Sequence, residues 1–326
     1  KRRDALDSHI LQDTETGTSG FFRTNSSAAL WTGYTSPITS FDSDGFTLIN
    51  GNGQSGINES GNELVSWTFR KAPGFFDVIN YTGNGTSGRT VAHSLGSTPG
   101  MIIIKSRSNG EPWAVWHRSL SGSETLRLNE TDAKANNNGW FNSTAPTSSV
   151  FTVGNATETN ANGYTYTAYV FAHDDQSFGT DGDEAVIKCG SYSSTGFVDL
   201  GFEPQWVMTK STSNTSAYTG DWRIFDNMRG IVDGDDNQLF ANESRAEDTG
   251  SFAQVLKLNP TGFTVESQGN YGTSTIYMAI RRPHKPPTAG TEVFQNLNYN
   301  GTSAVVTRST NILVDALITQ RTNAGV

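Results

Sequence analysis

Two long segments of the amino-acid sequence, residues 75–173 and residues 184–283, run in parallel landmark by landmark. Each segment opens with a strand-like run that ends in Tyr, followed by Leu-Gly, a Pro and an apolar run. A Trp-bearing run, a Phe-Thr-Val triplet and an aromatic-rich closing run follow in the same order. Self-similarity of this kind predicts tandem copies of one folded unit, because each copy needs the same strands to build its core.

The N-terminal part of the chain, residues 1–73, matches the second half of this repeat. Phe46–Leu48 corresponds to the Phe-Thr-Val triplet, and Leu64–Phe69 corresponds to the closing run. These matches predict that residues 1–73 form half a unit.

The C-terminal residues 291–326 match the first half of the repeat. Val293–Tyr299 corresponds to the opening run, and Asp315–Thr319 corresponds to the apolar run after the Pro position. A half-sandwich exposes unpaired strand edges, which proteins normally cover. We therefore expect residues 291–326 to pair with residues 1–73. Within one chain this pairing would close a ring of three units, and between chains it would be strand complementation.

Alternation in the closing runs separates a buried face from a mixed one. Large side chains occupy every second position, as at Val65, Trp67 and Phe69 in the first copy. This period of two is typical of a strand that buries one face against a second sheet. The 34 Gly residues suit short strands joined by many turns. We predict an all-β fold of tandem antiparallel β-sandwich units with an internal pseudo-threefold repeat, and a β-propeller is the alternative.

The repeat also sets the expected domain boundaries, because acidic, Gly-containing or Pro-rich stretches separate the copies and are typical of linkers. The predicted order is an N-terminal half unit at 1–73, a middle unit at 74–173, a linker at 174–183, a third unit at 184–283, a Pro-rich linker at 284–290 and a half unit at 291–326.

Charge and cysteine content exclude several classes of protein. The formal net charge of −9 and the pI near 5.0 argue against a nucleic-acid partner, which requires clustered Lys and Arg. Cys189 is the single cysteine, so neither an intrachain disulfide nor a multi-thiolate metal site can form. No run approaches the roughly 20 apolar residues of a membrane span, and we expect no membrane insertion.

Catalytic chemistry has no distinctive pattern in this sequence. The histidines have no His or Cys partner at metal-ligand spacing, and no Gly-x-Ser-x-Gly elbow is present. No acidic residue stands in a distinctive setting in both complete units, although the spacing of a carboxylate pair is set by the fold. We expect a protein that is not an enzyme and that needs no cofactor.

The run Asp233-Gly234-Asp235-Asp236-Asn237 is the best candidate for a cation site. Alternating short oxygen ligands on a tight turn can wrap Ca²⁺. The run lacks the distal Glu of an EF-hand loop and has no counterpart in the other units. A solvated turn is therefore the competing interpretation.

Several aromatic residues lie in polar loop contexts rather than in alternating runs. A ring that offers an apolar face beside polar groups is typical of sugar-binding surfaces, and the same rings serve protein–protein contacts. The candidate ligand-binding residues are Trp31, Trp140, Tyr164 and Tyr218.

An Asn-x-Ser/Thr triplet recurs at the same point of three units, at Asn25, Asn129 and Asn242. Each triplet is formally a glycosylation acceptor. A turn in which the Asn side chain bonds the backbone ahead of it explains the recurrence without glycosylation.

The ordered series NYTGNG, VAHSLGSTPGMIIIKSR, WAVWHRSL, LRLNETDA and YTYTAYVFA resembles the tandem β repeats of tailed phages, especially aquatic ones. Those repeats are found in tail-fibre-like and other virion proteins. More distantly, LG-x-x-P before an apolar strand and the later GFTV are similar to the small β-sandwiches of H-type lectins and phage fibre tips. That resemblance implies trimers and glycan binding, and it carries over no site residue. The resemblance to the phage repeats covers nearly the whole chain outside the linkers.

The repeats, the acidic surface and this resemblance together predict a non-enzymatic virion structural protein. We expect a tail-fibre, tail or surface-decoration component that acts in assembly and host-surface attachment. Its expected partners are other virion proteins, copies of itself and a host cell-surface glycan, and its expected location is the virion or the extracellular space. A glycan-binding adhesin or lectin and a self-assembling extracellular filament subunit are the alternatives.

Overall fold

The computed structural model describes residues 1–34, 36–49, 57–179, 181–213, 215, 219–231, 236–249, 255–267 and 274–282. The chain divides into two bodies, residues 1–282 and residues 283–326. The linker expected at 284–290 and the half unit expected at 291–326 lie outside the described residues, as does any pairing of that half unit with residues 1–73.

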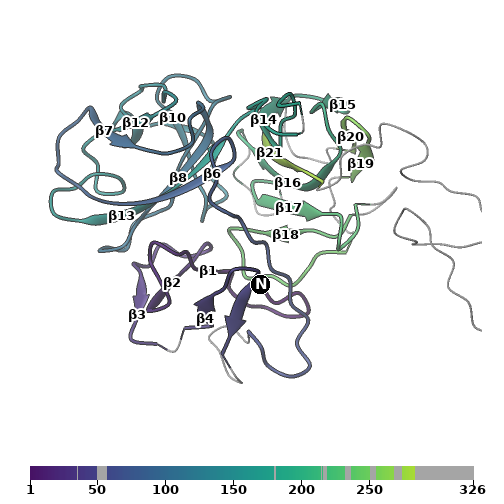
Figure 1. Ribbon diagram of the computed structural model, residues 1–326, viewed down its shortest axis with the longest axis horizontal. Helices are drawn as coiled ribbons and strands as arrows, with labels where there is room; N and C mark the ends of the chain where they lie inside the picture. The colour runs from purple at the N-terminus through teal and green to yellow at the C-terminus, as the bar shows by residue number, and fades with distance from the viewer. Residues whose placement is uncertain are drawn as a thin grey trace, which may run out of the picture. The chain divides into compact units, whose positions relative to one another are not determined.

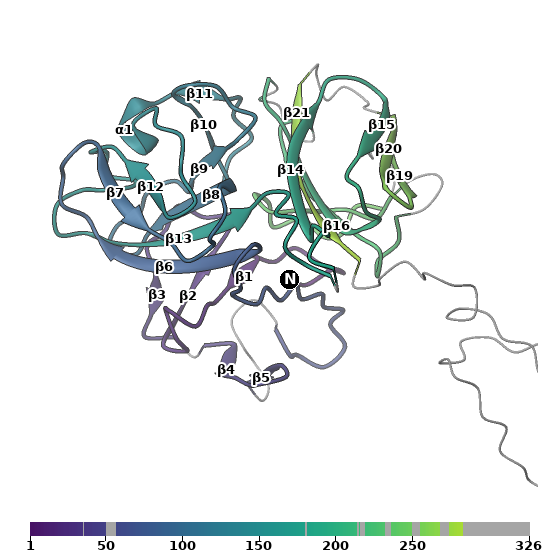
Figure 2. The same ribbon diagram turned by 45° about the horizontal axis from the view of Figure 1, so that its top comes forward.

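The middle unit is a sandwich of two antiparallel sheets (Figure 2). The larger sheet has the strand order β11-β10-β9-β8-β13-β6, and the smaller sheet pairs β12 with β7. The apolar strand β8 pairs with β9 on one side and with β13 on the other. The strands are β6 (Phe76–Thr82), β7 (Arg89–Ala92), β8 (Pro99–Ser106), β9 (Ala114–His117), β10 (Glu124–Arg127), β11 (Ala135–Asn136), β12 (Val150–Val153) and β13 (Thr165–Ala172).

The third unit repeats this plan. Its larger sheet has the order β14-β21-β16-β17-β18, and its smaller sheet has the order β15-β20-β19. The strands are β14 (Ile187–Tyr192), β15 (Gly196–Asp199), β16 (Pro204–Ser211), β17 (Trp222–Asp226), β18 (Leu239–Phe240), β19 (Val255–Asn259), β20 (Gly262–Ser267) and β21 (Thr275–Arg281).

The described N-terminal unit contains only the second half of the strand set. The sheet β1-β2-β3 pairs as β9-β10-β11 does, and β4 pairs with β5 as β19 pairs with β20. The expected closing strand Leu64–Phe69 makes only an isolated bridge, from Leu64 to Arg2. No described strand flanks residues 66–70, so they form no ladder. The strands are β1 (Ile10–Leu11), β2 (Gly20–Arg23), β3 (Trp31–Thr32), β4 (Ile38–Phe41) and β5 (Phe46–Leu48).

Helix is confined to one short turn, α1 (Asn138–Phe141), among the described residues. Asn137 caps its start by accepting from the Gly139 backbone N–H, and Asn142 ends it in the left-handed region at a φ of 54°. No helix in the described ranges is long and apolar enough to cross a membrane.

The two sheets of a unit share a core, which confirms the prediction of all-β sandwich units. In the third unit, the rings of Phe263 on β20 and Tyr277 on β21 meet edge to face with centroids 5.6 Å apart. In the middle unit, Tyr81 on β6 and Phe151 on β12 make a similar contact at 6.4 Å. Sheets stacked in this way are not propeller blades, so the propeller alternative is wrong.

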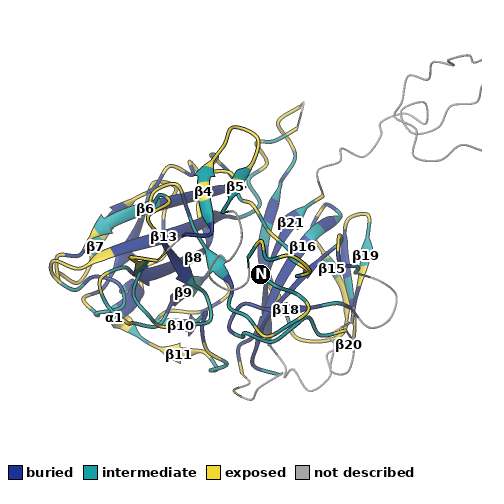
Figure 3. Cartoon of the chain, turned by 90° about the horizontal axis from the view of Figure 1, so that it is seen from below, coloured by how far each residue is buried: buried dark blue, intermediate teal, exposed yellow. Residues whose placement is uncertain are grey.

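The apolar stripe on the closing strands faces the neighbouring units and not the second sheet. In the third unit, Met278 and Ile280 lie in a core cluster that includes residues of the other two units. Tyr277 and Ala279, on the opposite face of β21, lie in a separate cluster with the second sheet. The prediction that the large residues pack on the second sheet is therefore wrong. Both faces of β13 and β21 are buried (Figure 3) because one lies inside the sandwich and the other lies between units.

Candidate functional site

The three repeat units meet at interfaces that are built from equivalent residues. Figure 1 shows the N-terminal strands in purple, the middle unit in blue and teal, and the third unit in green. One apolar cluster contains Phe22 of the N-terminal unit, Val115 of the middle unit and Ile224 of the third unit. The units share this apolar core, and hydrogen bonds between polar groups at its edges align one unit with the next.

A buried lysine crosses each interface, and each residue is at most 8% exposed. Every ammonium group donates to a backbone carbonyl of the neighbouring unit. The bonds run from Lys105 Nζ to Ser27 O at 2.8 Å, from Lys210 Nζ to Thr131 O at 3.1 Å and from Lys1 Nζ to Ser244 O at 2.8 Å. The middle unit thus binds the N-terminal unit, the third binds the middle, and the N-terminal unit binds the third, which closes a ring.

The same ammonium groups also donate to carbonyls of their own unit. These acceptors are Glu111 O at 2.7 Å from Lys105, Gly220 O at 2.6 Å from Lys210, and Asp7 O beside Lys1. Burial lowers the pKa of each of the three lysines from 10.5 to about 8. Near neutral pH each lysine is therefore a charged, buried group that backbone carbonyls satisfy, and its geometry fixes how two units are aligned.

A second row of equivalent residues lies just before or at the start of β1, β9 and β17. The indole Nε1 of Trp113 donates to Ser26 O at 3.0 Å, and that of Trp222 donates to Arg127 O at 2.8 Å. His9 holds this position in the N-terminal unit and is 5% exposed. The two indole rings lie in the apolar core between units, while their N–H groups bond the neighbouring chain segment.

A third row pairs a closing strand with the end of the Trp-bearing strand in the next unit. The donor group differs at the three interfaces, although it occupies an equivalent position in each. The contacts are Tyr169 Oη to Asp13 Oδ2 at 2.7 Å, Trp67 Nε1 to Asp226 Oδ2 at 2.9 Å, and His117 Nε2 to Tyr277 O at 3.1 Å.

One backbone hydrogen bond repeats at every interface as well. The bonds are Leu30 N to Arg107 O at 3.1 Å, Lys134 N to Thr212 O at 2.9 Å and Glu247 N to Arg3 O at 2.7 Å. Because the main chain itself follows the repeat, the pseudo-threefold relation extends from the fold of each unit to the contacts between units.

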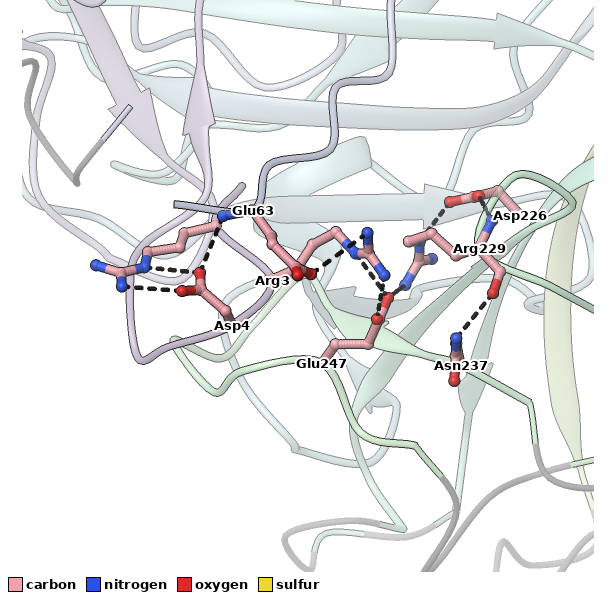
Figure 4. Close-up of polar contacts among 8 residues, drawn as sticks. Arg3, Asp4, Glu63, Asp226, Arg229, Asn237 and Glu247 are labelled. Carbon is pink, nitrogen blue, oxygen red and sulfur yellow. Dashed lines mark hydrogen bonds and ion pairs between the residues drawn. The ribbon is translucent and has the colours of Figure 1, made fainter. Parts of the chain in front are cut away.

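The interface between the N-terminal and third units carries an additional ion-pair network (Figure 4). Arg229 bonds Asp226 at 2.7 Å and Glu247 at 2.9 Å, and its side chain is 2% exposed. Arg3 bonds the other oxygen of Glu247 at 2.7 Å. Breaking a buried charge network by removing one member is costly, so these groups specify which surface meets the N-terminal unit.

The structure separates the aromatic candidates by burial. Trp140, in α1, is 1% exposed, so the prediction that its ring lies open in a polar loop is wrong. The capped turn of α1 carries the indole inward. Trp31 is half-buried beneath the guanidinium group of Arg23, which lies 4.2 Å from the ring centroid. Tyr164 is 37% exposed, and Tyr218 lies outside the described residues.

Two members of the Ca²⁺ candidate are described, and both bond the chain itself. Asp236 is fully buried and accepts from the Leu256 backbone N–H at 2.6 Å, while Asn237 donates to Arg229 O at 2.8 Å. Asp233 and Asp235 lie outside the described residues. Within the described ranges, no group of three or more His, Cys, Asp and Glu side chains could hold a metal ion.

Two of the three recurring Asn residues hold the start of the Trp-bearing strand of their own unit. Asn129 Oδ1 accepts from Trp113 N and Asn242 Oδ1 accepts from Trp222 N, both at 2.8 Å. Each Asn is less than 9% exposed, so neither amide is free to carry a glycan. The side chains of Asn129 and Asn242 bond the backbone, as expected. Their partners lie earlier in the sequence than the triplet, at the start of the Trp-bearing strand, whereas a partner later in the sequence was predicted.

The lysines of the interfaces were not singled out in the sequence. A Lys that ends an apolar run is ordinarily solvated, so neither Lys105 nor Lys210 stands out within its own unit. The available signal was their recurrence at the same place in both complete units. Lys1 lies at the same place in the N-terminal unit, because it pairs with Val65 as Lys105 pairs with Thr167.

Comparison with known proteins gives a family but no described activity. No curated protein matches the chain, and no solved structure matches it. The model of one family, described as Domain of unknown function (DUF7483), matches residues 1–283. That match spans all three described repeat units, and the chain therefore belongs to the DUF7483 family.

Proposed function

We propose that this protein is a non-enzymatic structural component of a bacteriophage virion, in the tail fibre, the tail or the surface decoration, and that it acts in assembly and host-surface attachment. The observation that supports this proposal is the ring of three equivalent interfaces within one chain. The resemblance of the repeats to virion proteins supplies the setting.

The ring gives one chain the arrangement of a homotrimer. Separate subunits of a trimer reach this arrangement only above a concentration set by their affinity. Covalent linkage removes that dependence, and it presents related surfaces three times with a high effective concentration. Such a module suits attachment to a threefold-symmetric neighbour, because matching symmetry lets three weak contacts form together.

The virion assignment is tested on purified particles of the phage that encodes the chain. Mass spectrometry should find peptides of the chain at a fixed ratio to the major structural proteins, and an antibody raised against the full chain should label one defined part of the particle. A chain that is absent from particles and present only in infected-cell lysate would contradict the proposal.

The attachment role is tested separately, with the full chain on an array of host-surface polysaccharides. Tyr164→Ala and Trp31→Ala should each reduce retention at least about tenfold, since stacked rings contribute much of the affinity of such sites. Phe197→Ala, at an aromatic residue of the third unit that is 54% exposed, is the matched control. Retention that is unchanged in both test variants would remove these rings from the attachment site.

A further inference from the structure

Three of the four described histidines lie between units, and all three face the third unit. Two belong to the middle unit and one belongs to the N-terminal unit. The contacts are His117 Nε2 with Tyr277 O at 3.1 Å, His173 Nδ1 with the Cys189 backbone N–H at 3.1 Å, and the His9 ring with the Phe240 backbone. Both interfaces of the third unit therefore contain a ring that can take up a proton in mild acid.

Two of these rings are held in the neutral form by their hydrogen bonds. His117 Nδ1 accepts from the Ser119 backbone N–H at 3.1 Å, and His173 Nδ1 accepts from the Cys189 backbone N–H. A protonated imidazole carries a proton on both nitrogens and accepts no hydrogen bond. Protonation would therefore place two donors face to face at each of these contacts, and the ring would have to leave its place.

The surroundings of His117 and His173 also oppose protonation while the units are docked. Burial lowers the pKa of His117 from 6.5 to about 3 and that of His173 to about 4, and the Arg118 guanidinium acts in the same direction on both. Asp174 opposes this effect at His173 but is paired with Lys188 at 3.6 Å. The neutral groups of the third unit that meet these rings are Cys189 and Tyr277, whose pKa values burial raises.

His9 lies in a comparable setting at the other interface of the third unit. Its ring is 5% exposed and stacks on Trp67 with the centroids 6.2 Å apart. Within the described residues, His9 Nε2 has no hydrogen-bond partner. Burial lowers the pKa of His9 well below 6.5, and the side-chain ammonium and α-amino groups of Lys1 and the guanidinium of Arg229 add to this effect. A proton on this ring would be buried beside cations.

The interface between the N-terminal and middle units uses other chemistry. Trp113 stands at the position that His9 holds, and its indole N–H donates to Ser26 O at 3.0 Å. Tyr169 Oη makes a further contact, 2.7 Å from Asp13 Oδ2. Among the described hydrogen bonds between these two units, none uses a histidine. Indole and phenol groups gain no proton in mild acid, so these donors persist there.

We propose that mild acid releases the third unit from both of its neighbours while the N-terminal and middle units stay docked. Above pH 6.5 neither the docked nor the released form takes up a proton, so the interfaces keep their full stability. Between pH 6.5 and about pH 4 the released form binds protons that the docked form excludes. The ratio of docked to released form then falls about tenfold per pH unit for each of His117 and His173. This inference does not depend on the virion assignment.

The native Cys189 reports on this release. It is the single cysteine, it is 1% exposed, and its side chain lies in the apolar core between units. The probe is 4,4′-dithiodipyridine, which reacts with exposed thiols in mild acid, and the rate for the full chain is divided by that of a small free thiol at the same pH. This relative rate should rise at least about 100-fold between pH 7 and pH 4.5. An unchanged relative rate would overturn the proposal.

The matched control moves the thiol to the interface between the N-terminal and middle units. Val78 on β6 is equivalent to Cys189 on β14, and it is 3% exposed. It lies on the strand face from which Asn80 donates to Glu15 O of the N-terminal unit. In a chain with Cys189→Ala and Val78→Cys, the thiol should stay protected at pH 4.5. A rise as large as that of Cys189 would mean that acid opens the whole ring, against a selective release.

Substitution of the histidines tests whether they cause the release. His117→Gln with His173→Asn keeps amide groups near the bonded ring atoms and removes both titrations. At pH 4.5 the relative rate of Cys189 should be at least about tenfold lower in this variant than in the unaltered chain. His93→Gln is the control, because His93 accepts from the Leu95 backbone N–H within the middle unit. Equal rates at pH 4.5 in the double variant and the unaltered chain would contradict the assignment.

Discussion

Three lysines illustrate how single residues hold this molecule together. Lys105 donates to one carbonyl in its own unit and to one in the neighbouring unit, and no carboxylate of the described residues is bonded to it. A carbonyl has a fixed place in the main chain, so such a bond specifies the alignment of two backbones. The charge is buried at a cost, which its hydrogen bonds to the two carbonyls offset.

Replacing Lys105 with Met should therefore weaken the chain. Lys105→Met keeps the side-chain volume but leaves Ser27 O and Glu111 O without this donor. We expect the free energy of unfolding to fall by about 2 kcal/mol, because the loss of two hydrogen bonds from a charged donor outweighs relief of the buried charge. Urea denaturation measures the change. Lys257→Met, at a side chain that is 46% exposed, is the control, and an equal loss in the two variants would contradict this role.

His117 makes the molecule sensitive to acid. Its Nδ1 accepts from the Ser119 backbone N–H at 3.1 Å, so Nε2 carries the proton and donates to Tyr277 O across the interface. Burial lowers the pKa of His117 from 6.5 to about 3. Between these values the unfolded chain takes up a proton and the folded chain does not. The stability present above pH 6.5 is therefore lost as the pH falls toward 3.

A non-titrating substitution isolates this effect. His117→Gln keeps a donor near the position of Nε2 and removes the titration. Between pH 7 and pH 5 the unaltered chain should lose about 2 kcal/mol more stability than His117→Gln does, from a pKa shift of this size. Thermal or urea unfolding at the two pH values checks this difference. Parallel losses in both proteins would show that His117 does not carry the acid sensitivity.

At the scale of strands, the close approach of β8 and β14 depends on a glycine. A Cβ atom added at Gly100 would lie 2.7 Å from the Cys189 sulfur and 2.7 Å from the His173 Cβ. These neighbours are buried or belong to the connector between units, so they have little room to move. Gly100 therefore sets how closely the middle and third units pack.

Gly100→Ala should destabilise the chain by about 1–3 kcal/mol, the usual cost of overpacking. Gly45→Ala is the control, because an added Cβ there meets no atom within 4 Å. The free energy of unfolding from denaturant titration compares the two variants. A Gly100→Ala chain as stable as the control would mean that the two strands can separate at no cost.

The strands were predictable because period-two alternation and turn residues are local signals. The closing strands β13 and β21 were found in this way, and the pairing of Lys1 with Val65 follows the alignment of the three copies. Which layer each face contacts was not predictable. Met278 and Tyr277 alternate on one strand, and nothing in an apolar pattern distinguishes a second sheet from a neighbouring unit.

The candidate site was less predictable than the fold. Trp140 stands among polar residues in the sequence, yet a capped turn buries it. The lysines look like solvated strand ends until their neighbours in space are known. Contacts such as Trp67 with Asp226 join residues that are far apart along the chain, and only the arrangement of whole units brings them together.

For the molecule as a whole, the repeat units form a ring instead of an open row. Two interfaces join units that are consecutive in the sequence, and linkers alone would keep those units close. The third interface joins the N-terminal unit to the third unit through Lys1, Arg3 and Trp67. This interface closes the ring, so it distinguishes a single-chain pseudo-trimer from a string of sandwiches.

A double-mutant cycle between Trp67 and Asp226 tests this closure most directly. Trp67→Phe keeps an aromatic ring and removes the indole N–H, and Asp226→Ala removes its acceptor, which lies 2.9 Å away. The free energies of unfolding of the single variants and the double variant give the coupling between the two sites. The ring predicts a coupling of at least about 1 kcal/mol, as expected for a partly buried hydrogen bond to a carboxylate. Additive effects with no coupling would contradict a closed ring.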